Sequence, residues 1–318
     1  MARRRMTEKD AIVISGILGL AILLLVSPFW APMIWNAMTP QKAPTVSGSG
    51  VTGKKEPEKV VEQQLPIHDE SGMTLQTRIN PTSGYRRTDV ESGSLGEFLR
   101  NYELKKATAK VKLWDGTKRE KQDTVQAVFR LPMEKEDLQR AAGTILRVYT
   151  EYFWNQRTYD KISFLFANGF RAEYKKWQEG FLIRTDDTGS IWVNGGSTDN
   201  SEENLKKYMH TVLVYTSADS LAQESHKIKK EELQIGDILL KTGTEADAVM
   251  VVDECVNEQG KKAYLFAKGG KPAQQFHLLK NPAHEEDPWY YEEELSYPIS
   301  TSEGDFAKGS MRRPDYLQ

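Results

Sequence analysis

An uncharged segment near the N-terminus constrains this chain more than any other feature of its sequence. Residues 11–35 contain no charged side chain, and Ile, Leu, Val, Ala and Gly dominate their centre. Roughly 20 such residues, rising about 1.5 Å each in a helix, cross the hydrocarbon core of a bilayer. The preceding residues 1–10 carry four basic side chains against two acidic ones, and the positive-inside rule keeps such a segment in the cytoplasm. We therefore expect a transmembrane helix over 11–35 that follows a cytoplasmic basic segment over 1–10.

Two other interpretations of this segment exist. A cleaved signal peptide needs small residues just before the cut, whereas the sequences ending at Ala31 and Ala37 place an aromatic residue there. A helix buried in a soluble core would be unusually long and apolar on all sides. We therefore predict an uncleaved signal anchor in the lipid bilayer. The protein would then be a single-pass protein of the cell membrane, with its C-terminal part extracytoplasmic.

The rest of the chain divides by composition into a linker, a domain and a tail. Residues 36–65 are rich in Gly, Ser, Thr, Pro and Lys and lack spaced large apolar residues, which is typical of a flexible linker. Residues 66–289 hold most of the aromatic side chains and are long enough for one domain. Residues 290–318 are acidic and then contain proline, so we expect an extended C-terminal tail.

Charge and cysteine content exclude several classes of protein. The chain has 43 basic and 45 acidic residues, a net charge of -2, so no basic surplus exists for binding nucleic acid. One cysteine permits neither an internal disulfide nor a multi-cysteine zinc site. The five histidines have no metal-ligand spacing, and no glycine-rich stretch has the spacing of a phosphate loop. We expect no metal and no cofactor.

The order of the expected elements indicates an α+β domain with helices packed on an antiparallel sheet. Ser94, with Glu97 three residues later, is typical of the start of a short helix through residue 100. Apolar residues at three- and four-residue steps predict long helices over residues 135–156 and 205–221. Apolar runs near residues 238, 249, 265 and 277, separated by turn residues, predict an antiparallel meander. Residues 185–201 are rich in Asp, Gly, Asn and Ser and indicate a mobile surface loop around Ile191.

One stretch of the meander resembles a catalytic motif. Gly236-Asp237 opens one expected strand, and Ala246-Asp247-Ala248-Val249 opens the next, which ends in Val252-Asp253. This pattern resembles papain-like cysteine hydrolases of the NlpC/P60 and CHAP types, in which a Gly-Asp turn opens one strand and a catalytic histidine begins the next. The resemblance implies a papain-like (NlpC/P60-like) fold.

A longer resemblance covers most of the expected domain. Between about residues 93 and 289 the chain is similar to a bacterial family described as domain of unknown function 4846. The motifs that carry the similarity are short but occur in combination: Phe98-Leu99-Arg100-Asn101, Val111-Lys112-Leu113-Trp114-Asp115-Gly116, Asp137-Leu138-Gln139, Asn168-Gly169-Phe170-Arg171, Gly236-Asp237, Pro272-Ala273-Gln274 and Asn281-Pro282. The family implies no established activity.

Three positions depart from the pattern that the resemblance implies. Where a cysteine would begin the long helix the chain has Ala141, where a histidine would begin the strand it has Asp247, and where a glutamine would follow the next strand it has Lys268. Cysteine, histidine and a polar orienting residue would form a thiol-nucleophile triad. Ala141, Asp247 and Lys268 are therefore candidates for a degenerate catalytic site, and we expect Asp247 and Lys268 to form an ion pair.

Other candidates for chemistry are weaker. Cys255 follows two acidic residues, which oppose thiolate formation, so we expect an inert thiol. Asp237 and Asp253 could act as an acid and base pair across neighbouring strands, although an aspartate after glycine or at a strand end more often serves turn chemistry. His277 alternates with apolar residues and is more simply structural.

These observations lead to one expected function and two alternatives. We expect a membrane-anchored cell-envelope protein whose degenerate hydrolase-like domain acts in binding or scaffolding, on a cell-wall or envelope protein ligand. The first alternative is an active envelope hydrolase that uses the carboxylates of Asp237, Asp247 or Asp253 on peptidoglycan or a peptide amide. The second is an accessory subunit of a membrane complex, which would expose an apolar patch around residues 191–193.

Overall fold

The longest apolar runs of the sequence form the centre of an antiparallel sheet. The computed structural model describes residues 65–317, and its central strands are β8 (Ile238–Lys241), β9 (Asp247–Asn257), β10 (Lys262–Lys268) and β11 (His277–Leu279). They pair in chain order, with Ile238 opposite Met250 and Met250 opposite Ala267. The antiparallel sheet and the α+β class predicted from the sequence are confirmed.

Further strands extend this sheet to nine members in the order β2-β11-β10-β9-β8-β15-β7, with β1 paired to β9 and β12 to β10. Its other strands are β1 (Tyr85–Arg87), β2 (Val125–Val128), β7 (Ser225–Lys227), β12 (Tyr290–Tyr291) and β15 (Met311–Pro314). Among residues 65–317, three hairpins lie outside it: β3 (Ser163–Leu165) with β4 (Arg171–Glu173), β5 (Phe181–Asp186) with β6 (Gly189–Asn194), and β13 (Ile299–Thr301) with β14 (Gly304–Phe306). The helices are α2 (Leu75–Arg78), α3 (Leu95–Arg100), α4 (Ala141–Asn155), α5 (Tyr174–Gln178), α6 (Glu202–Tyr215) and α7 (Ala218–Gln223).

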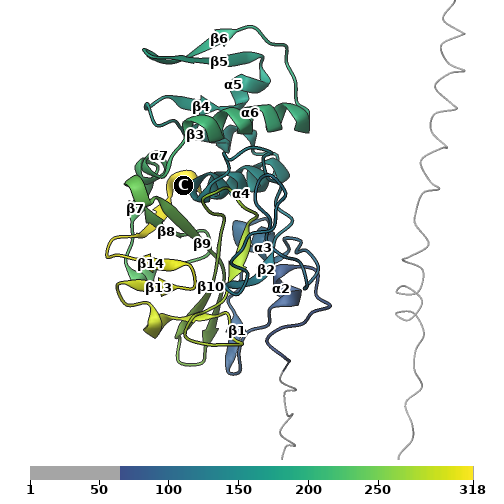
Figure 1. Cartoon of the computed structure of the whole chain (residues 1–318), viewed down its shortest axis with the longest axis vertical. Coiled ribbons are helices and arrows are strands. Elements are labelled where there is room, and N and C mark those ends of the chain that lie inside the picture. Colours follow the sequence, from purple (N-terminus) through teal and green to yellow (C-terminus); the bar gives the residue numbers. More distant parts are fainter. Residues whose placement is uncertain (1–64, 318) are drawn as a thin grey trace, which may run out of the picture. The chain divides into compact units, whose positions relative to one another are not determined.

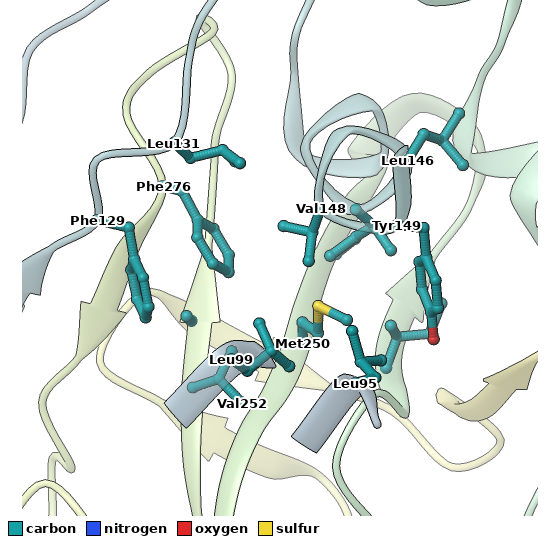
Figure 2. Packing of buried hydrophobic residues seen from close by; sticks show 14 of the residues in the cluster. Leu95, Leu99, Phe129, Leu131, Leu146, Val148, Tyr149, Met250, Val252 and Phe276 are labelled. Atoms are coloured by element: carbon teal, nitrogen blue, oxygen red, sulfur yellow. The ribbon is translucent and has the colours of Figure 1, made fainter. Parts of the chain in front are cut away.

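Both faces of the sheet are covered. Helices α3 and α4 pack on one face, where Val148 of α4 and Leu99 of α3 approach Met250 and Val252 of β9 (Figure 2). On the other face, Val249 and Val251 belong to a second apolar cluster that includes residues of β14 and β15. Because alternate residues of β9 enter different cores, residues 248–252 are all fully buried and form a continuous apolar run.

The C-terminal segment differs from the extended tail predicted over residues 290–318. It contributes β12 and the β13–β14 hairpin, and β15 lies within the sheet between β8 and β7. Met311 is fully buried, and the ring of Tyr316 packs edge-on against Tyr149 of α4, with centroids 5.0 Å apart. The acidic and proline-containing composition of this segment concealed four short strands, of which β12 and β15 pair with strands distant in sequence.

Capping residues determine where helices α3 and α7 begin. Helix α3 begins after Ser94, whose hydroxyl accepts a hydrogen bond from the Glu97 backbone, as predicted. Helix α4 begins at Ala141 rather than near residue 135. The helix predicted over 205–221 is two helices, because Ser217 forms a capping box that starts α7 after α6 has ended.

The segment predicted as a mobile loop over residues 185–201 is largely a hairpin. Strands β5 and β6 pair from Phe181 opposite Asn194 to Asp186 opposite Gly189. In Figure 1 this hairpin lies at the far end from the large sheet, beyond α5 and α6, while α4 lies between. Asp, Gly and Thr at positions 186–189 supply its turn, so these residues join two strands rather than form an open loop.

The predicted cytoplasmic segment, transmembrane helix and linker lie almost entirely outside the described residues. Within residues 65–317, no helix is both long enough and apolar enough to cross a bilayer. The described residues fall within one compact unit.

Candidate functional site

A cleft of about 350 Å³ opens at the N-terminal end of α4. One wall is the start of this helix, a second is the junction of α6 and α7, and a third is the turn that leads into β9. Its lining includes Ala141, Ala142, Gly143, Leu213, Asp247 and Lys271. A side chain at position 143 would collide with Leu213, since a Cβ atom there would lie 2.6 Å from its Cδ2 atom. Glycine at this position therefore lets α6 approach the first turn of α4.

The first turn of α4 has unused hydrogen-bond donors. Arg140 is the N-cap residue, and its side chain makes no capping bond; it pairs instead with Asp137 at 2.7 Å. That hydrogen bond, opposed by burial and aided by the Ala273 backbone and nearby positive charges, lowers the pKa of Asp137. Among residues 65–317, no acceptor binds the backbone N–H groups of residues 141–143. These N–H groups and the helix dipole favour an oxygen that carries negative charge.

Asp247 and Lys268 meet at one edge of the cleft. Asp247 is the first residue of β9, and Lys268 is the last residue of the neighbouring antiparallel strand β10. The Lys268 Nζ atom lies 2.7 Å from Asp247 Oδ2, with 6% and 18% of the two side chains exposed. Asp247 Oδ1 also accepts a hydrogen bond from the Ala248 backbone. The expected ion pair is present, and it is largely shielded from solvent.

The sequence-predicted residues 141, 247 and 268 are thus brought to one region by three different elements. Ala141 and Asp247 line the same cleft, and Asp247 and Lys268 both line an adjoining cleft of about 420 Å³. Ala141 is the first residue of α4, which is where a helix dipole acts most strongly on a side chain. At that position the chain has a methyl group, which can neither ionise nor attack a carbonyl carbon.

A buried glutamate that the sequence did not single out completes this region. Glu303, in the turn between β13 and β14, lies 3.8 Å from Lys268 Nζ, 2.9 Å from His277 Nε2 and 2.7 Å from Arg119 Nη2. It also accepts a hydrogen bond from Thr124. Burial alone would raise the pKa of Glu303, but the hydrogen bond to His277 and the charges of His277, Lys268 and Arg119 lower it to about 2.

Glu303 could not have been predicted, because it belongs to the segment interpreted as an extended tail. His277 offered a partial signal, as a titratable side chain between apolar neighbours on a strand. It is fully buried and lies 3.0 Å from Arg119 as well as within reach of Glu303. His277 therefore connects β11 to the charged cluster that Glu303 forms with Arg119 and Lys268.

Asp237 and Asp253 do not share a site. Asp253 is fully buried and accepts hydrogen bonds from the Nε atoms of Arg87 and Arg100, each at 2.7 Å. Asp237 binds Arg313 through both oxygens and accepts a hydrogen bond from the Gln234 backbone in the turn before β8. Burial raises the pKa of Asp237, and Arg313 opposes that effect. These contacts indicate structural roles for both carboxylates.

The single thiol lies away from the clefts. Cys255 is fully buried in β9, with Arg87 opposite it in β1 and Ala263 opposite it in β10. Burial, reinforced by the charge of Asp253, raises the pKa of this thiol well above its ordinary value. A buried, protonated thiol is a poor nucleophile. Within the described part of the chain, no group of three or more Cys, His, Asp or Glu side chains is arranged to hold a metal ion.

Comparison with known proteins assigns a family. No curated protein and no solved structure matches the chain. The model of one family, described as Domain of unknown function (4846), matches residues 75–313, which is well over half of the 318 residues. The match spans α2 to β15 and therefore includes the clefts, the ion pair and Glu303. The chain belongs to the family described as Domain of unknown function (4846).

Proposed function

We propose that this domain is a ligand-binding module derived from a papain-like hydrolase, and that it works at the cell envelope on a membrane tether. The observation that carries the proposal is the shielded Asp247–Lys268 ion pair beside a cleft whose helix begins with Ala141. In the NlpC/P60-like arrangement, these three positions would hold the histidine, the orienting residue and the nucleophile.

The order of elements supports a papain-like origin. A long helix that begins at the nucleophile position precedes an antiparallel meander, and the histidine position opens a strand of that meander. The orienting position lies at the adjacent end of the next strand. Such an arrangement lets three residues distant in sequence meet at one cleft, as a catalytic triad requires.

The chemistry of the present side chains favours binding over cleavage. A thiol mechanism needs a nucleophile and a base beside it, whereas Ala141 has no reactive group and Asp247 is already neutralised by Lys268. The free N–H groups at the start of α4 remain able to bind a carbonyl or carboxylate oxygen. The cleft would therefore hold an acyl or carboxylate group of a cell-wall or envelope protein ligand without attacking it.

The proposed tether rests on the sequence alone. Residues 11–35 are uncharged over a length that spans a bilayer, and basic residues precede them. A linker over residues 36–65 would hold the domain away from the lipid surface. The ligand would accordingly be an extracytoplasmic one.

Restoring the triad tests this proposal. In the full-length chain, Ala141→Cys alone adds a thiol at the helix start, and adding Asp247→His with Lys268→Gln supplies the base and its partner. If the triad lowers the thiol pKa from about 8.5 to about 6.5, the thiolate fraction at pH 6.5 rises roughly 50-fold. A thiolate of lower pKa is also a weaker nucleophile, so the alkylation rate at pH 6.5 should rise only about fivefold. Iodoacetamide labelling from pH 5.5 to 9 measures the alkylation rate at position 141, with native Cys255 as an unreactive internal control.

Equal labelling rates of the single and triple variants at pH 6.5 would contradict the papain-like assignment. Binding is tested separately by following the backbone amide resonances of residues 141–143 while acetyl-D-alanine is added to the unmodified chain. Shifts confined to these residues and their neighbours support a binding cleft. Absence of any shift argues against it.

One observation favours the alternative of a subunit in a membrane complex. Leu182 of β5 and Ile191 of β6 are 39% and 49% exposed, and both lie on the outer face of their hairpin, since Ile183 and Trp192 pack against the core. Apolar side chains exposed together mark contact surfaces in many proteins. Replacing both with Ser should release a partner from the detergent-solubilised complex without changing the free energy of unfolding, if this alternative is right.

A further inference from the structure

A second open cleft lies at the other end of α4 and is separate from the Ala141 region. It has a volume of about 530 Å³ and lies between the C-terminal turn of α4 and the segment formed by α3 and the residues that follow it. Because α4 has 15 residues rising about 1.5 Å each, its two ends are about 20 Å apart. None of the residues proposed for the degenerate site lines this cleft.

Aromatic rings in fixed orientations form much of its surface. Phe98, Tyr102 and Trp154 line the cleft, and each is partly exposed. Phe98 packs edge-on against Tyr102 with centroids 5.2 Å apart, and Trp154 packs at 4.9 Å on Tyr159. Because these contacts hold the rings before any ligand arrives, little side-chain freedom is lost on binding.

Neutral polar groups at the same surface are without partners. In the part of the chain that the structure describes, no hydrogen bond is made by the Tyr102 hydroxyl, the Trp154 indole N–H or the amide side chains of Asn155 and Gln156. Burial, reinforced by the charge of Glu151, raises the pKa of Tyr102, so its hydroxyl keeps its proton. The cleft thus offers hydrogen-bond donors and acceptors that carry no charge.

Each carboxylate that lines the cleft has a partner within the chain. Glu97 accepts a hydrogen bond from the Gly93 backbone at 2.6 Å, Glu103 pairs with Arg130, and Glu151 pairs with Arg147 at 2.6 Å. A cationic ligand would have to compete with these internal partners. The aromatic faces and the neutral donors and acceptors, in contrast, have no such competition, and spermidine serves as the cationic probe.

We propose that this cleft binds a neutral saccharide chain. Sugar rings present C–H groups on one face and hydroxyl groups at the edge. The C–H groups suit the negative face of an aromatic ring, and the hydroxyls suit neutral donors and acceptors such as those of Tyr102, Asn155 and Gln156. A concave site with an aromatic lining and a few placed polar groups is the usual form of a small-ligand site. The proposal is independent of the degenerate hydrolase site.

Saturation-transfer NMR and calorimetry on the full-length chain test this proposal. The probes are the β-1,4-linked tetramers of N-acetylglucosamine and of glucose, with spermidine as a cationic probe. We expect at least one tetramer to bind through its ring protons. Tyr102→Phe removes one hydroxyl and should weaken that binding roughly five- to tenfold. The double variant Asn155→Ala with Gln156→Ala changes only exposed side chains and should weaken it by at least as much.

Matched controls decide where binding occurs. Trp154→Phe should weaken saccharide binding, whereas Trp192→Phe, on β6 and not among the residues that line the cleft, should leave it unchanged. The triad variants at positions 141, 247 and 268 should also leave it unchanged, which separates this cleft from the proposed function. The proposal is overturned if neither tetramer binds, if spermidine alone binds, or if binding survives both Tyr102→Phe and the double variant.

Discussion

Glu303→Gln should remove one pH-dependent contribution to the free energy of unfolding. In the folded chain Glu303 is 8% exposed beside His277, Arg119 and Lys268, and its pKa is about 2 instead of 4.5. At about 1.36 kcal/mol per pKa unit, this difference corresponds to about 3 kcal/mol of stabilisation. Glutamine preserves the shape of the side chain but cannot carry the charge, so the variant should lose about this amount at pH 7.

The direction of the pH dependence follows from the two pKa values. Because the folded pKa lies below the unfolded one, the stabilisation is fully present above about pH 5 and is lost as the pH falls toward 2. The difference in free energy of unfolding between the original chain and Glu303→Gln should therefore shrink from about 3 kcal/mol at pH 7 to about 1.5 kcal/mol at pH 3. Nothing comparable is expected of a glutamate that faces solvent.

Urea denaturation followed by tryptophan fluorescence at pH 7, 5, 4 and 3 measures this difference. Glu258→Gln, at an exposed position in the turn between β9 and β10, is the matched control and should change stability by less than about 0.5 kcal/mol at every pH. If the gap between the original chain and Glu303→Gln is as wide at pH 3 as at pH 7, the cluster does not hold Glu303 ionised, and the electrostatic reasoning fails.

Three further predictions concern the buried framework. Asp253→Asn should destabilise the chain by roughly 3–5 kcal/mol in urea denaturation, because it leaves Arg87 and Arg100 inside without a carboxylate; a loss below about 1 kcal/mol would mean that solvent reaches these arginines. Native Cys255 should resist Ellman's reagent until the chain unfolds, so prompt release of thionitrobenzoate at pH 8 would argue against a buried thiol. Met311→Ala should lower the free energy of unfolding by roughly 2–5 kcal/mol, since Met311 is fully buried in the second apolar cluster. An unchanged urea midpoint would show that β15 is dispensable.

Elements with strong local signals could be predicted from the sequence. Helix α3 follows from Ser94 as its cap, and most of α4 follows from the three- and four-residue spacing of its apolar residues. The meander follows from apolar runs separated by glycine-containing turns. In each case the residues that determine the element lie within a few positions of one another.

Elements that depend on distant partners could not be predicted. Strand β15 is four residues long, and two of them are arginines, so its place between β7 and β8 follows from what it meets there rather than from its own pattern. Strand β2 likewise pairs with β11, about 150 residues later in the chain, and Leu113 pairs with Gln274. Short strands of mixed composition have no register of their own until a partner strand supplies it.

In the candidate site, three residues could be located from the sequence and one could not. Ala141, Asp247 and Lys268 could be located because the family resemblance implies a triad at these positions, and each lies at the end of a helix or strand. Glu303 could not, since it reaches the site from a hairpin turn in the C-terminal segment. Its presence changes the electrostatic argument: with Glu303 only 3.8 Å away, Lys268 is shared between two carboxylates. Lys268→Gln alone should therefore destabilise the domain, and the histidine at position 247 in the triad variant would partly replace the lost positive charge.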